Sequence, residues 1–213
     1  MKTDDLVTML ATGAGAVRPN QAARRYATAV GCGALGAAML MAVLLGPRHD
    51  LAAAALLPMF WVKTAFVISF AAASLFAALR MSRPGLSLAW VPRLLSAPVI
   101  AIWLLAAAVL IRADAEQRTM LFFGSSWNYC PFLIALLSAP MFIAAMWAMK
   151  GLAPTRLRLA GAAAGLLAGA VGAMVYSVHC PEMAAPFIGF WYLLGMLIPT
   201  AVGTLLGPRL LRW

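Results

Sequence analysis

Residues Pro131–Met149 read PFLIALLSAPMFIAAMWAM, and residues Leu159–Val178 read LAGAAAGLLAGAVGAMVYSV. Each stretch carries no charge and is about 20 residues long, which as an α-helix spans roughly 30 Å, the thickness of a bilayer core. The short loop between them is basic. The sequence therefore predicts a hairpin of two membrane helices, with the residues before Pro131 and after Val178 at the same membrane face.

The rest of the chain repeats this pattern of long apolar runs. Of its 213 residues, 64% are hydrophobic and 10% are charged, and the mean hydropathy is +0.92. Soluble domains do not need so much apolar surface, so we expect an all-α integral membrane protein that forms one bundle of six transmembrane helices. The predicted spans are Ala27–Leu45, Leu56–Leu79, Leu94–Ile111, Pro131–Met149, Leu159–Val178 and Phe187–Leu206.

The net charge of +10 is distributed unevenly between the two sides of the predicted spans. Twelve Lys and Arg residues fall on the side that holds both termini, whereas three, Arg48, Arg112 and Arg118, fall on the other side. The positive-inside rule therefore predicts that both termini are cytoplasmic. A basic rim beside anionic lipid accounts for the net charge, so we expect the lipid bilayer as a partner and no direct contact with nucleic acid.

The first 25 residues are polar and begin with a short amphipathic pattern. It consists of a capping residue, two acidic residues suited to a first helical turn, and three apolar residues on one face: Thr3, Asp4, Asp5, Leu6, Met9 and Leu10. Such a helix is either an interfacial anchor or a docking peptide whose apolar face enters a groove on a partner. We therefore divide the chain into a cytoplasmic arm, residues 1–25, and a transmembrane domain, residues 26–213.

Two Cys-Pro dipeptides, Cys130-Pro131 and Cys180-Pro181, lie at the outer ends of the fourth and fifth spans. Pro131 suits the first turn of a helix and Pro181 suits the exit from one. Each proline thus places a cysteine at a helix boundary, where a thiol meets water and titrates. The sequence alone leaves three roles open for this pair: apolar filling, a structural disulfide, or a reactive site.

Two neighbouring side chains widen the chemistry available at this face. The motif around the second cysteine is His179-Cys180-Pro181-Glu182. Two thiolates with an imidazole or carboxylate can bind a soft cation, so Cys130, Cys180 and His179 are candidate metal ligands, with Glu182 in support. His179 as a simple hydrogen-bonding partner at a helix end is the alternative.

Lys63 is the one full charge well inside a predicted span. A charge is costly in hydrocarbon, so this side chain either snorkels to the outer surface or faces an interior site near the cysteines.

A ladder of small residues, Gly161, Gly165 and Gly169, runs along the fifth span at a spacing of four. Such ladders let two helices approach closely. We expect the ladder to pack inside the bundle, with Gly31 as a counterpart, rather than in a dimer.

Sequence motifs of enzymes are missing. The chain has no C-x-x-C, H-E-x-x-H or G-x-S-x-G motif and no histidine pair placed to hold a haem. Its spans hold almost no acidic residues, which argues against a proton-coupled transporter. We therefore expect neither catalysis nor a cofactor. The alternative is a membrane thiol redox enzyme or a small transporter that uses the same cysteines, which a bound quinone or a substrate flux would reveal.

Three features together resemble the NrsF-type membrane anti-sigma factors, which are negative regulators of an extracytoplasmic-function sigma factor. They are the arm with Thr3-Asp4-Asp5-Leu6-Val7 and Val17-Arg18-Pro19, the six-span layout, and the two Cys-Pro motifs. The resemblance covers essentially the whole chain. It implies a regulator that holds its sigma factor at the bacterial inner membrane and releases it when an oxidant or a thiophilic metal reacts with the two cysteines.

The same resemblance assigns roles to individual residues. Sensing falls to Cys130 and Cys180, with His179, Glu182, Pro131 and Pro181 in support. Docking of the sigma factor falls to the arm, at Asp4, Asp5, Leu6, Leu10, Arg18 and Pro19. The arm is short for an anti-sigma domain, so the cytoplasmic loops are expected to share the contact.

Overall fold

The computed structural model describes residues 3–13, 20–82 and 87–212, so Arg18 and Pro19 of the predicted arm lie outside the described residues. Six helical segments in these ranges are long and apolar enough to cross a membrane: α2 (Gln21–Leu44), α4 (Pro58–Met81), α5 (Val91–Arg112), α7 (Cys130–Lys150), α8 (Leu157–Tyr176) and the continuous segment Ala185–Leu210. The predicted six-span helical architecture is confirmed. The largest boundary difference is in the first span, which begins at Gln21 rather than Ala27.

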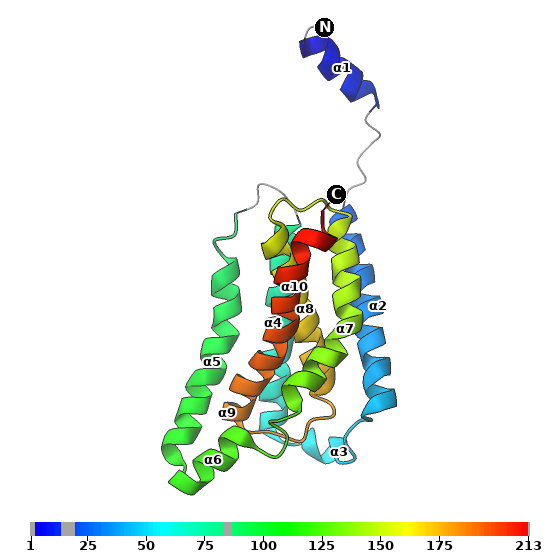
Figure 1. Ribbon diagram of the computed structural model, residues 1–213. Helices are drawn as coiled ribbons and strands as arrows, with labels where there is room; N and C mark the ends of the chain where they lie inside the picture. The colour runs from blue at the N-terminus through cyan, green and yellow to red at the C-terminus, as the bar shows by residue number, and fades with distance from the viewer. Residues whose placement is uncertain (1–2, 14–19, 83–86, 213) are drawn as a thin grey trace.

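Three shorter helices lie outside the six spans in the described chain, and the last span is composite (Figure 1). Helix α1 (Thr3–Gly13) belongs to the arm, and α3 (Leu51–Ala54) and α6 (Ala115–Phe123) are short connecting helices. The last span consists of α9 (Ala185–Phe187), a π-helical turn η1 (Ile188–Tyr192) and α10 (Leu193–Leu210). A π-helical turn inserts an extra residue into the helix, which shifts the side chains on either side of it around the helix axis.

Helix α8 lies at the centre of the bundle and packs against α10, α7, α4 and α2. Its glycines make this close packing possible, because a Cβ at Gly161 would collide with the main-chain oxygen of Gly203, and one at Gly165 would collide with that of Pro199. The ladder therefore packs inside the bundle, as the sequence predicts. Gly31 is not its counterpart, since a Cβ there would meet no atom within 4 Å, and α10 takes that place.

The bundle has two distinct ends (Figure 1). One end, here called the cysteine end, carries α3, α6 and the start of α9, and the opposite end, here called the terminal end, holds the start of α2 and the end of α10. Helix α1 lies away from the bundle beyond the terminal end, and α5 lies at its periphery. The helices thus separate the cysteines from the arm by the full length of the spans.

Candidate functional site

The two Cys-Pro motifs meet at the cysteine end. Helix α7 begins at Cys130 with Pro131 in its first turn, as predicted, and the Cys130 N–H donates to the oxygen of Ser126 at 2.9 Å. Helix α8 ends at Tyr176, and the chain turns so that the Cys180 N–H donates to the Tyr176 oxygen at 2.9 Å. These two local geometries bring the two free thiols close together in the same apolar core.

Burial of both thiols differs from the sequence-based expectation. The side chains of Cys130 and Cys180 are 0% exposed, and both belong to the main apolar core of the bundle. The expectation that a helix boundary gives contact with water is therefore wrong for this pair, because the chain after α8 folds back over the end of the bundle. Reagents that reach the thiols must be small.

Three polar side chains surround the thiol pair: Lys63, Tyr176 and Tyr192. The hydroxyls of Tyr176 and Tyr192 lie beside the two sulfur atoms, and neither closes a well-formed hydrogen bond with a described residue. The two tyrosine rings also contact each other, with centroids 5.8 Å apart. Together with the two cysteines, these residues form a buried polar group in an apolar core, here called the thiol cluster.

Lys63 is fully buried and belongs to this cluster. Its Nζ donates to the main-chain oxygens of Cys180 at 2.9 Å and Glu182 at 3.2 Å. Of the two positions that the sequence left open, the interior one is therefore correct and snorkelling is not. Among the described residues, no carboxylate forms an ion pair with this ammonium. The two carbonyl oxygens are therefore the groups that offset the cost of burying its charge.

The surroundings of Cys180 favour its thiolate. The pKa of this thiol lies below the ordinary value for cysteine, chiefly because the Cys130 thiol donates a hydrogen bond to its sulfur. The charge of Lys63 and the Tyr192 hydroxyl act in the same direction, whereas burial opposes them. A thiolate is the nucleophilic and metal-binding form of cysteine, so these surroundings favour reaction at the thiol pair.

His179 and Glu182 do not lie where a metal site shared with the two cysteines would require them. The Nδ1 of His179 lies 2.8 Å from the oxygen of Gly46. One carboxylate oxygen of Glu182 accepts hydrogen bonds from the main-chain N–H and the hydroxyl of Ser125, both at 2.8 Å. Within residues 3–13, 20–82 and 87–212, no group of three or more His, Cys, Asp and Glu side chains is placed to hold a metal ion. The geometry thus offers two sulfur ligands without the third ligand that His179 was expected to supply.

An aromatic group lies beside the thiol cluster. Its members, from α6, the following loop and η1, are Phe122, Phe123, Trp127, Phe190 and Trp191, and neighbouring rings have centroids 5.0–6.2 Å apart. The Trp191 indole also donates to the oxygen of Phe122 at 2.8 Å. Tryptophan is enriched at membrane–water interfaces, and the exposed Trp127 of this group is consistent with such an interface near the cysteine end.

The arm carries the predicted amphipathic helix. Helix α1 has Asp4 and Asp5 in its first turn and ends at Gly13. Its apolar side chains Leu6, Met9 and Leu10 are exposed. An apolar helix face with no cover from the bundle is a suitable docking surface.

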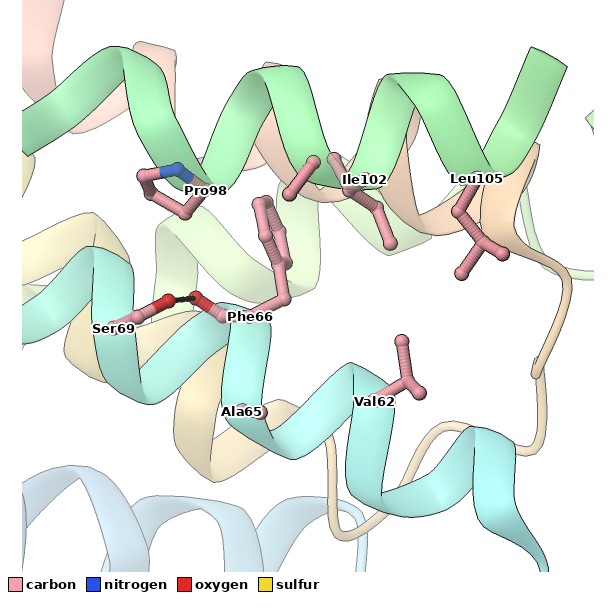
Figure 2. Close-up of a pocket in the computed structure, with 8 residues that line it drawn as sticks. Val62, Ala65, Phe66, Ser69, Pro98, Ile102 and Leu105 are labelled. Carbon is pink, nitrogen blue, oxygen red and sulfur yellow. Dashed lines mark hydrogen bonds between the residues drawn. The ribbon is translucent and has the colours of Figure 1, made fainter. Parts of the chain in front are cut away.

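A groove between α4 and α5 has a volume of about 400 Å³ (Figure 2). Its lining residues are Val62, Ala65, Phe66, Ser69, Pro98, Ala101, Ile102 and Leu105. Ser69 supplies the one polar side chain of this lining, and its hydroxyl donates to the Phe66 oxygen of its own helix at 2.9 Å. The groove therefore offers no polar group for specific recognition, and the chemistry of the molecule lies in the thiol cluster instead.

Comparison with known proteins gives consistent matches over the whole chain. A family model described as "Negative regulator of sigma F", NrsF, matches residues 10–213. The chain is 63% identical to the "Probable anti-sigma-F factor NrsF" of Azospira oryzae and 38% identical to the "Anti-sigma-F factor NrsF" of Caulobacter vibrioides, with 100% of each chain covered in both cases. No solved structure matches.

Proposed function

The chain belongs to the family of negative regulators of sigma F, and from this premise we propose a mechanism for its regulation. The protein holds an extracytoplasmic-function sigma factor at the cytoplasmic face of the bacterial inner membrane. It releases this factor when an oxidant or a thiophilic metal reacts with Cys130 and Cys180 at the periplasmic face. The arm, α1, supplies the main docking surface, and the cytoplasmic loops share the contact.

The observation that carries this proposal is a pair of thiols that lie close together at the end of the bundle opposite the arm. Two thiols placed this close can be joined by oxidation or bridged by a soft cation, which is what the proposed sensor requires. Two other features support the assignment of sides: the predicted excess of basic residues at the terminal end, and the exposed apolar face of α1 beyond that same end.

Oxidation of the pair follows ordinary thiol chemistry. The Cys180 thiolate attacks the chlorine of hypochlorous acid, and hydroxide leaves. The Cys130 thiol then attacks the resulting sulfenyl chloride, chloride leaves, and the proton released from Cys130 combines with hydroxide to give water. Two sulfur atoms lose two electrons in total, and chlorine gains them. Hypochlorous acid is small and neutral, which suits access to a buried pair.

A thiophilic metal reaches the same end point without electron transfer. A cation bound by the sulfurs of Cys130 and Cys180 bridges them as a disulfide does, and both modes fix the relative position of the α7 start and the segment after α8. The described geometry supplies two sulfur ligands, so a soft cation that accepts two thiolates fits better than one that requires four protein ligands.

Substitution of each thiol tests this function in cells that carry a reporter for the sigma factor. We expect Cys130→Ser and Cys180→Ser to lose most of the induction by hypochlorite and by cadmium, because serine forms neither a disulfide nor a soft-metal bond. Cys32→Ser is the matched control, since Cys32 is exposed and lies on α2 away from the pair. Normal induction in both single variants would refute the cysteine-based release.

A further inference from the structure

Lys63 links the cysteine motif to the second span. Through its two hydrogen bonds it holds the main chain on both sides of Pro181, at Cys180 and Glu182. Residues 180–184 have no regular secondary structure, so this segment relies on side chains to fix its position. If the Lys63 ammonium lost its hydrogen bonds to both carbonyl oxygens, nothing would offset the cost of burying its charge. Lys63 and residues 180–184 must therefore move together.

Reaction of the thiols displaces that same segment. Cys130 is held at the first turn of α7, with its N–H bonded to Ser126, whereas Cys180 lies in the irregular segment. A disulfide bond is about 2.05 Å long, well below the contact distance of two free thiols. Closing the bond therefore draws Cys180 toward α7, and the two carbonyls bound by Lys63 move with it.

Helix α4 carries this displacement to the terminal end. From Lys63 the helix continues to Met81 without a proline, so about 28 Å of regular helix separates Lys63 from Ser82. A regular helix transmits an axial shift or rotation with little loss, because each turn is fixed to the next by main-chain hydrogen bonds.

Tyr26 contacts the C-terminal end of α4. This residue lies in the second turn of α2 and is buried, and its hydroxyl hydrogen-bonds to the Ser82 hydroxyl at 2.8 Å and to the Ala78 oxygen at 3.3 Å. The neighbouring Arg25 stacks on Trp147 of α7, with its guanidinium 4.4 Å from the ring centroid. The start of α2 is thus clamped between α4 and α7, immediately after the arm.

We propose that Lys63 and Tyr26 are the two ends of a relay along α4, which converts the reaction of Cys130 with Cys180 into a change at the start of α2 and so in the arm. The relay rests on the proposed function, because it explains how the thiol pair and the docking surface communicate. Lys63 is a positioning residue in this scheme: it moves with the cysteine motif and forms no bond to either sulfur, although its charge favours the Cys180 thiolate.

The test separates thiol chemistry from its output. In cells exposed to hypochlorite, the Cys130–Cys180 disulfide is quantified by differential alkylation and mass spectrometry, and release is quantified with the sigma-factor reporter. Lys63→Met removes the donors while keeping the length of the side chain, and Tyr26→Phe removes one hydroxyl at the other end. Lys63→Met also removes a charge that favours the Cys180 thiolate, so the variants are compared with the native protein at equal fractions of disulfide. At the same fraction of Cys130–Cys180 disulfide, we expect both variants to show at least a fivefold smaller reporter induction.

Two control variants separate the relay from general damage to α4. Lys63→Arg keeps a charged donor and should restore most of the induction. Ser74→Ala removes a buried α4 hydroxyl that bonds within its own helix, to Phe70, and should change neither readout. If the Lys63→Met variant does not accumulate in the membrane, the Tyr26→Phe variant alone tests the relay.

Normal induction in Tyr26→Phe, or in Lys63→Met with its disulfide formed, would overturn the relay. Failure of the proposed function would look different, because the native protein itself would then show no hypochlorite-dependent disulfide or no linked release.

Discussion

The Nζ of Lys63 lies 2.9 Å from the main-chain oxygen of Cys180, although the two residues are separated by 117 positions in the chain. This contact places the one lysine of the second span beside the thiol pair and joins three parts of the bundle: α4, the start of α7 and the segment after α8. In the proposed mechanism, the buried pair of thiols is the input, and the arm beyond the opposite end is the output.

The ionisation of Cys180 is the first prediction. Its pKa is lowered chiefly by the Cys130 thiol, so Cys180 should remain a thiolate at pH values where an ordinary cysteine, with a pKa of about 8.5, is protonated. In the purified protein with Cys32→Ala, thiolate absorbance at 240 nm is followed while the pH is lowered. It should persist through the ordinary pKa of cysteine and disappear only at lower pH. Cys130→Ala removes the donor and should move the titration upward. A midpoint unchanged by Cys130→Ala would show that another group controls the thiolate.

The second prediction concerns the docking face of the arm. Leu6→Ala combined with Leu10→Ala should abolish repression while leaving the protein in the membrane, because both side chains are exposed on one face of α1. Reporter activity without stress is the measurement, with immunoblots of the membrane fraction. Thr8→Ala, on the opposite face, is the matched control, since its hydroxyl bonds to the Asp4 oxygen within the helix. If the double variant still represses, the docking surface lies in the cytoplasmic loops.

The third prediction concerns the glycine ladder. Gly165→Ala should destabilise the bundle by about 1–3 kcal/mol, because the new Cβ meets main-chain atoms of Pro199 and Thr200, which cannot move away cheaply. Gly31→Ala should be neutral or stabilising by up to about 1 kcal/mol, since it adds a methyl group in open space and favours the helix. Unfolding in detergent with increasing denaturant distinguishes the two. Equal stability of both variants would contradict the observed crossing of α8 and α10.

The orientation in the membrane is the fourth prediction. Dual topology reporters fused after Asp50, Glu116 and Glu182 should register as periplasmic, and a fusion after Pro154 should register as cytoplasmic. The reason is the excess of basic residues in the segments at the terminal end. The reverse pattern would place the thiols in the reducing cytoplasm and remove their exposure to periplasmic oxidants.

Span lengths and the shared face of the cysteines could be predicted from sequence because both depend on local periodicity. Helices of about 20 residues on each side of a short basic loop leave little choice about where Cys130 and Cys180 lie. The small-residue ladder likewise predicted close packing. Its partner could not be predicted, because Gly31 and Gly203 are equally small in the sequence, and only the packing of α8 on α10 decides between them.

The remainder of the thiol cluster could not be predicted because it depends on how distant segments meet. Lys63 had two physically reasonable positions, and the choice depended on which face of α4 turns inward. Tyr176 lies four residues before Cys180, a spacing that could have indicated a shared side. Tyr192 gave no such signal, since the π-helical turn η1 alters the register of its side chain. The contact between Glu182 and Ser125 joins loops 57 residues apart, which no local pattern records.

Release of the sigma factor from the purified complex shows whether the state of the thiol pair controls sigma-factor binding. The protein with Cys32→Ala would be reconstituted in lipid nanodiscs with its sigma factor, and retention would be followed by co-elution before and after hypochlorite, with the thiol state determined by mass spectrometry. We predict that the complex is stable while Cys130 and Cys180 are free, dissociates as their disulfide forms, and reassembles after reduction. Retention of the sigma factor with the disulfide fully formed, or a disulfide already present in the unstressed complex, would contradict the account.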